Sequence, residues 1–145
     1  MVNIFDVDAD KIIKKTKEEL KKVEQIKPPA WSKFVKTAIA NSRPPQEDDF
    51  WYTRAAAIMR QLYKTDRPLG VQRLRTKYGG KQQNKIKPAH FKKGSGSIIR
   101  KLMQQLEAAG FIKKTVVNKH AGRVLTPKGK SFIDKIATAL LKGPK

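Results

Sequence analysis

The chain has 145 residues, which is enough for one domain with a substantial hydrophobic core. It contains 33 Lys and Arg residues but only 12 Asp and Glu residues, so the formal net charge is +21. Self-repulsion of this size destabilises a compact chain unless a polyanion offsets it, which argues against a merely solvated basic surface. Charge alone favours nucleic acid as the partner, with an anionic membrane as the second candidate.

Cysteine content and apolar runs exclude several other classes. The sequence contains no cysteine, so it offers neither a disulfide framework nor a thiol site, and this fits a cytoplasmic location. The first ten residues lack a basic stretch followed by a long apolar run, so we expect no signal peptide. No stretch approaches the roughly 20 apolar residues that a membrane span needs.

The charge is divided unevenly along the chain. Residues 1–49 hold ten bases and nine acids, whereas residues 50–145 hold twenty-three bases and three acids. Between positions 67 and 106 there are eleven bases and no acid. We therefore expect a single domain, 1–145, in which a near-neutral helical part (1–49) braces a basic body (50–145) that faces the polyanion.

Two helices are predicted in the near-neutral part. Residues 9–23 carry apolar side chains with a period of about 3.6, and Asp8 or Asp10 can cap the start of that helix. The pair Pro28-Pro29 ends it. The positions i, i+3, i+4, i+7 and i+8 of a short second helix are then filled by Trp31, Phe34, Val35, Ala38 and Ile39.

Three helices are predicted in the first half of the basic body. A long central helix over 47–64 begins with acids and ends with bases, which suits the helix dipole. A short helix fits 70–78, and residues 97–109 form the clearest amphipathic stripe of the chain, with Gly110 as its C-cap. The apolar face of the central helix consists of Trp51, Ala55, Ile58, Met59 and Leu62.

A hairpin and a final helix complete the prediction. Two β-prone runs, 111–117 and 123–125, are separated by Asn-Lys-His-Ala-Gly, which is typical of a hairpin. Thr126 and Pro127 then supply an N-cap and a first-turn proline for the final helix. The order of helix, short helix, well-capped helix and immediate hairpin is that of a winged helix-turn-helix. We therefore predict a mainly α, winged helix-turn-helix-like helical domain with one β-hairpin wing and extra N-terminal helices.

The segment 76–96 departs from the tight turn of a typical helix-turn-helix. It holds six lysines, four glycines and a proline, and no acid. We interpret it as an irregular loop that faces RNA, because lysines on a glycine-rich backbone can follow an uneven phosphate path. The rings of Tyr78 and Phe91 either stack on bases or anchor the loop to the core, and both alternatives remain open. Gly79 and Gly80 most simply make a turn.

Several motifs resemble one known family. They are WYTRAAA (51–57), TKYGG (76–80), KPAHF (87–91), GSGSIIRKLMQQLE (94–107) and GRVLTPKGKSFID (122–134). Together they resemble the archaeal–eukaryotic small-subunit ribosomal protein S-nineteen-e family over nearly the whole chain. The resemblance implies a mostly helical winged-helix protein, without catalytic activity, that binds ribosomal RNA in the head of the small subunit and takes part in subunit maturation.

The candidate RNA-binding residues are bases of the predicted helices, loop and hairpin, together with one ring. Two of them, Arg54 and Arg60, lie about 120° apart on the central helix and can flank one groove only if it is wide. We expect RNA contacts from Arg54, Arg60, Arg73, Arg75, Lys77, Tyr78, Lys81, Lys85, Lys87, Lys92, Lys93, Arg100, Lys101, Lys113, Lys114 and Arg123.

Catalysis and cofactor binding are not indicated. The three carboxylates after residue 49 are isolated in sequence, and His90 and His120 lack the spacing of a metal site. Ser95 and Ser97 are better explained as helix caps than as nucleophiles. We expect no metal, no cofactor and no enzymatic activity, and an enzyme acting on RNA is a distant third hypothesis.

The leading hypothesis is a structural constituent of the small ribosomal subunit that binds ribosomal RNA and supports assembly. We expect it to be a monomer within the cytoplasmic ribosome, beside neighbouring head proteins, with no membrane or small-molecule partner. The alternative is a winged-helix DNA-binding transcriptional regulator, which would need a dimerising element and a tight turn before its third helix.

Overall fold

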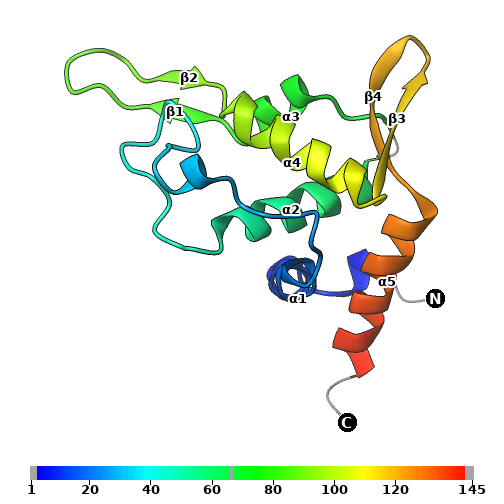
Figure 1. The fold of residues 1–145 in the computed structure, drawn as a ribbon. Helices are drawn as coiled ribbons and strands as arrows, with labels where there is room; N and C mark the ends of the chain where they lie inside the picture. Colours follow the sequence, from blue (N-terminus) through cyan, green and yellow to red (C-terminus); the bar gives the residue numbers. More distant parts are fainter. Residues whose placement is uncertain (1–2, 66, 143–145) are drawn as a thin grey trace.

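The computed structural model describes residues 3–65 and 67–142, and five α-helices make up about half of it (Figure 1). The α-helices are α1 (Ala9–Lys21), α2 (Phe50–Lys64), α3 (Val71–Lys77), α4 (Gly96–Ala108) and α5 (Pro127–Lys142). Two short 3-10 helices, η1 (Ile4–Asp6) and η2 (Ala30–Lys33), precede α1 and α2. Two antiparallel hairpins pair β1 (Gly80–Gln82) with β2 (His90–Lys92) and β3 (Ile112–Val117) with β4 (His120–Leu125). The mainly α, winged-helix-like class is confirmed.

The helix α2 lies at the centre of the core, as its apolar face predicts. Trp51, Ala55, Ile58, Met59 and Leu62 are all buried, and α2 packs against α1, α4, α5 and β4. The indole Nε1 of Trp51 donates to Oε1 of Gln105 on α4 at 2.8 Å. The amide of Gln105 in turn donates to the carbonyl of Lys27 at 2.7 Å, so one side chain joins α2, α4 and the linker after α1.

The helix α1 buries Ile12, Thr16 and Leu20 against α2 and α5. Positions spaced by four residues lie on one face of a helix, which explains why these three point inward. Asp8 occupies the N-cap position, although its side chain makes no capping hydrogen bond. The N-terminal part therefore shares one hydrophobic core with the body that follows it.

The helix α4 ends in a Schellman motif around Gly110, which confirms that residue as its C-cap. Gly110 has a φ of +76°, its N–H donates to Glu107, and the N–H of Phe111 donates to Leu106 at 3.0 Å. Thr126 caps α5 as predicted, because its hydroxyl accepts from the N–H of Gly129 at 3.2 Å. The chain direction is thus fixed at both ends of the wing.

The wing is longer than predicted. Its two-residue turn, Asn118-Lys119, has φ values of +49° and +64°, as in a type I′ turn, and β4 begins directly at His120. The predicted five-residue loop is therefore wrong, because two residues with positive φ are enough to reverse the chain. Leu69 and Arg123 also exchange two backbone hydrogen bonds, each with an N to O distance of 3.0 Å. The chain around Leu69 therefore lies beside β4 as a third short segment.

The predicted helix over 31–39 is also wrong. Only η2 forms there, and the chain then turns at Phe34 and bends before a bridge between Ala38 and Gly94. Trp31 packs edge-on against Trp51 with ring centroids 5.8 Å apart, but Phe34 is 81% exposed. The chain obtains backbone hydrogen bonds from residues 94–95 instead of from a local helix, a long-range preference that the helical spacing cannot reveal.

The segment 76–96 is not an irregular loop but carries the first hairpin. Its register pairs Gly80 with Lys92, Lys81 with Phe91 and Gln82 with His90. The ring of Phe91 packs so closely over Gly79 that an added Cβ there would lie 2.6 Å from it. Gly79 therefore permits a close approach at the base of the hairpin rather than simply making a turn.

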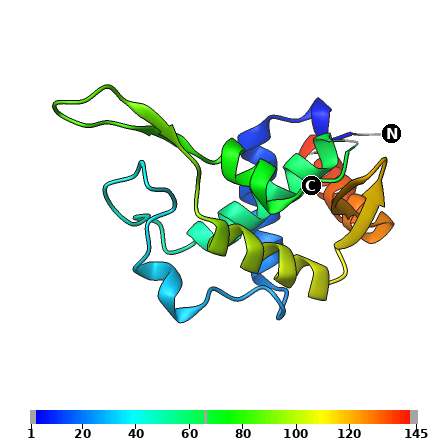
Figure 2. The ribbon, with the colours of Figure 1, turned by 90° about the horizontal axis from the view of Figure 1, so that it is seen from above.

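The two hairpins lie at opposite ends of α4 (Figures 1 and 2). The strand β2 leads into the N-terminus of α4, and β3 follows its C-terminus. Thirteen helical residues separate the two attachment points by about 20 Å. Within the described ranges, no helix combines the length and apolar character that a bilayer crossing requires.

Close packing at Gly129 predicts a specific stability change. A Cβ at this position in α5 would collide with the carbonyl oxygen of Phe111 and lie 2.9 Å from a methyl of Leu125. We expect Gly129→Ala to destabilise the protein by about 2 kcal/mol, as other overpacked cores do. In urea unfolding, the control Gly70→Ala should cost less than about 0.5 kcal/mol, because its Cβ meets only the Ala121 carbonyl at 3.8 Å. Equal stability of the two variants would contradict this packing.

Candidate nucleic-acid interface

Eleven of the sixteen predicted RNA-binding residues are exposed, and they lie on α3, α4 and the two hairpins. On α4, the buried positions Ile98, Ile99, Leu102 and Met103 leave residues 100 and 101 on the opposite face. The eleven exposed residues, called the cationic surface below, are Arg73, Lys77, Lys81, Lys85, Lys87, Lys92, Lys93, Arg100, Lys101, Lys113 and Lys114.

The first hairpin is the most exposed part of the cationic surface. Every residue from 83 to 93 is exposed, and the hairpin extends away from the helices in both views (Figures 1 and 2). Lys81 and Phe91 are cross-strand partners, so they share one face of the ribbon. Phe91 is still 49% exposed, so this face presents a cation beside an aromatic ring.

Arg54 and Tyr78 are half-buried and pack against each other. The guanidinium carbon of Arg54 lies 4.0 Å from the ring centroid of Tyr78 and 5.5 Å from that of Phe50. Burial lowers the pKa of Arg54, and burial likewise raises the pKa of Tyr78. The ring of Tyr78 therefore anchors the end of α3 to α2, the second of the two alternatives that the sequence leaves open.

The remaining three predicted residues are half-buried. Arg75 donates from Nε to the carbonyl of Gly94 at 3.0 Å, which ties α3 to the hairpin base. Arg123 donates from Nε to Glu107 at 3.2 Å. Arg60 on α2 has a buried Nε without a hydrogen-bond partner among the described residues. The structure thus places Arg75 beside the cationic surface, whereas Arg54 and Arg60 are half-buried at separate positions of α2.

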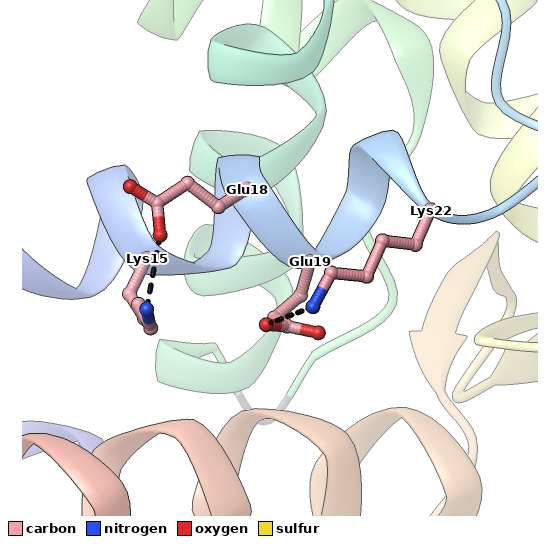
Figure 3. A network of polar contacts seen from close by, with 4 residues as sticks. All are labelled: Lys15, Glu18, Glu19 and Lys22. Atoms are coloured by element: carbon pink, nitrogen blue, oxygen red, sulfur yellow. Dashed lines mark hydrogen bonds and ion pairs between the residues drawn. The ribbon is translucent and has the colours of Figure 1, made fainter.

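Acidic residues neutralise different amounts of charge in the two parts of the chain. Along α1, Lys15 pairs with Glu18 at 3.0 Å and Lys22 with Glu19 at 2.8 Å (Figure 3). Asp49 pairs with Lys21 at 2.6 Å, and this hydrogen bond holds the pKa of Asp49 below its ordinary value. The near-neutral part therefore neutralises much of its own charge.

The basic body has few such contacts. Glu107 accepts from Arg123 and lies 3.5 Å from Lys114, while Asp134 accepts a hydrogen bond from Tyr63 at 2.8 Å. Both acids that the structure describes after Phe50 are thus engaged inside the protein. The exposed bases of α3, α4 and the first hairpin form no ion pair within the described residues.

One exposed cluster was not predicted. Phe34 and Ile39 are 81% and 55% exposed, and Lys36 lies between them. The helical spacing of 31–39 predicts both apolar residues on the inner face of a helix. No local signal could have found them, because the run fills the helical positions i, i+3, i+4, i+7 and i+8.

Metal chemistry is not supported by the arrangement of side chains. Across 3–65 and 67–142, no three His, Asp or Glu side chains are grouped as metal ligands. Ser95 occupies the N-cap of α4, in line with a structural role.

The buried phenol of Tyr78 predicts an alkaline loss of stability. The folded chain keeps this proton to a higher pH than the unfolded chain does. The contribution of Tyr78 to the free energy of unfolding is therefore complete below about pH 10, and it is lost as the pH rises through the pKa of the folded state. Tyr63 behaves alike, since burial and its hydrogen bond to Asp134 raise its pKa. We expect Tyr78→Phe to remove one late-ionising phenol in an ultraviolet titration and to flatten the decline of stability above pH 10. An unchanged decline would contradict the burial of this ring.

Comparisons with known proteins agree with the motifs. The profile of the family described as "Ribosomal protein S19e" matches residues 3–143. The chain is 44% identical to a protein of Aeropyrum pernix named "Small ribosomal subunit protein eS19" over 143 residues, which cover 98% of this chain and 92% of that protein. A protein of the same name from Thermoplasma volcanium is 39% identical over 98% of this chain and 91% of its own length.

A eukaryotic relative is similar to the same extent. The protein of Ascaris suum named "Small ribosomal subunit protein eS19G" is 39% identical over 138 residues, which cover 95% of this chain and 91% of that protein. Membership of a ribosomal protein family agrees with the cytoplasmic, ribosomal location expected from the sequence. Since the profile and the relatives span nearly the whole chain, it belongs to the ribosomal protein S19e family.

Proposed function

We propose that the protein is a structural constituent of the small ribosomal subunit that binds ribosomal RNA and supports subunit assembly, without enzymatic activity. The observation that carries the proposal is the cationic surface, whose bases on α3, α4 and the first hairpin have no acidic partner among the described residues. Such bases neutralise phosphates and release counterions, which favours binding to any folded polyanion.

The spacing of the two hairpins supports binding to structured RNA. Their attachment points are about 20 Å apart along α4, so the two ribbons can contact phosphates of different strands or helices. Double-stranded RNA is bound mainly through its shape, phosphates and 2′-hydroxyls. The half-buried Arg54, Arg60 and Arg123 then support the cationic surface and contact the RNA at its edge.

The N-terminal part has a different role in this proposal. Residues 1–49 brace the basic body within a single domain through α1, which packs on α2 and α5. Their near-neutral charge suits contact with neighbouring proteins of the small-subunit head better than contact with RNA. The protein acts as a monomer within the ribosome.

DNA recognition is the weaker alternative, although the winged-helix order favours it. A recognition helix reads bases with its N-terminal residues. Here the residues just before α4 are held against the N-terminal part, because Gly94 is buried and the N–H of Ser95 donates to the carbonyl of Thr37 at 2.8 Å. The first hairpin also replaces the tight turn between α3 and α4.

A salt titration with matched variants tests the proposal. We expect affinity for a transcript of the ribosomal RNA head domain to fall steeply with salt, and Arg100→Ala with Lys101→Ala to reduce the log–log slope by about 1 to 2. The control, Lys11→Ala with Lys14→Ala, removes the same charge from exposed positions of α1 and should leave the slope unchanged. Equal slopes for both double variants, or tighter binding to duplex DNA than to this RNA, would refute the proposal.

A further inference from the structure

We propose that a groove beside the first hairpin binds one unpaired RNA nucleotide, with its base against Phe34 and its phosphate among three cations. The inference rests on the proposed function and names a specific ligand for one edge of the RNA-binding surface. The groove has a volume of about 450 Å³, and it lies between segment 34–39 and the base of the hairpin. This volume falls in the range of small-ligand sites.

The groove is lined by both apolar and cationic side chains. Phe34, Val35 and Ile39 are its apolar residues, and Lys36, Arg75 and Lys93 are its cations. Among the described residues, no acid lines it. A nucleotide carries an apolar, polarisable base next to an anionic phosphate, and the two kinds of lining residue match these two parts.

The exposed ring of Phe34 is held in place by the backbone around it. Its N–H donates to the carbonyl of Trp31 at 3.1 Å, and the next residues are fixed by the Ser95 to Thr37 hydrogen bond and the bridge from Ala38 to Gly94. A ring that is 81% exposed on such a tied segment keeps a large apolar face in water. The segment is therefore preorganised to hold this face toward a ligand rather than toward the core.

The guanidinium of Arg75 is also preorganised. The Nε of Arg75 donates to Gly94 at 3.0 Å and one terminal nitrogen donates to Gln72 at 3.3 Å, which fixes the plane of the guanidinium. Lys36 and Lys93 also line the groove and are exposed. Guanidinium and ammonium groups placed together bind a phosphate strongly.

The position of the groove favours RNA over an acidic peptide as the occupant. Arg75 and Lys93 belong both to the groove and to the stretch of eleven bases without an acid, so the groove continues the predicted RNA-binding surface. An unpaired nucleotide bound here would extend from an RNA helix that lies along the first hairpin. An acidic, aromatic peptide is the competing occupant and is included in the test.

The test uses the full-length protein and three RNA hairpins: one with a single unpaired 2-aminopurine, one with an abasic bulge and one fully paired. We expect the bulged base to bind about tenfold more tightly than the paired or abasic hairpin, with a change in 2-aminopurine fluorescence on binding. Phe34→Ala should abolish this preference while leaving affinity for paired RNA within about twofold. The control Phe5→Ala removes another exposed ring, far along the chain, and should retain the preference.

The remaining outcomes separate the groove from the proposed function. Binding of paired RNA without any preference for the bulged base would refute the proposed nucleotide site and leave the RNA-binding role intact. A preference that survives Phe34→Ala would have the same consequence. Failure to bind any of the three RNAs would overturn both. A labelled peptide of alternating glutamate and phenylalanine should not bind in a Phe34-dependent way; if it does and RNA shows no bulge preference, the occupant is a protein and the proposal is wrong.

Discussion

Mutual repulsion among the bases between residues 67 and 106 is the constraint on which the rest of the structure depends. Eleven positive charges without an acid must be held on one folded surface. The apolar faces of α2 and α4 supply the opposing attraction, since Trp51, Met59, Leu102 and Met103 are almost completely buried. The burial of the Arg54 guanidinium against Tyr78 and Phe50 then shields one further charge inside the body. The burial of apolar side chains in the core thus offsets the repulsion among the bases at the surface.

The helix α4 belongs both to the hydrophobic core and to the cationic surface. Its buried face fixes it on α2, while its exposed face carries Arg100 and Lys101 and its two ends carry the hairpins. Because only residues 93–95 and 109–111 connect the helix to the two hairpins, their basic side chains keep a defined spacing. Preorganisation of this kind reduces the entropy lost when a rigid RNA is bound. In the near-neutral part, by contrast, ion pairs such as Lys21 with Asp49 already neutralise the bases.

Much of this arrangement could be predicted from the sequence, and the failures have identifiable causes. The helices α2, α4 and α5 have long apolar stripes, and Gly110 and Thr126 cap α4 and α5, so local information determines these helices. The run 31–39 has helical spacing too, but its backbone is paired with residues 94–95, a contact between segments far apart in sequence. The first hairpin has only three paired positions and depends on the close approach of Phe91 to Gly79, which no periodicity reveals. The exposure of Lys81 or Arg100 could be predicted; the burial of Arg54 could not.

The central claim is that the cationic surface, and not the basic residues in general, contacts ribosomal RNA. Lysine acetylation footprinting by mass spectrometry, with and without the small-subunit RNA, tests it directly because lysines occur in both parts of the chain. The account predicts strong protection of Lys81, Lys87, Lys93 and Lys101 and unchanged reactivity of the lysines of α1. Uniform protection, or protection mainly on α1, would contradict it.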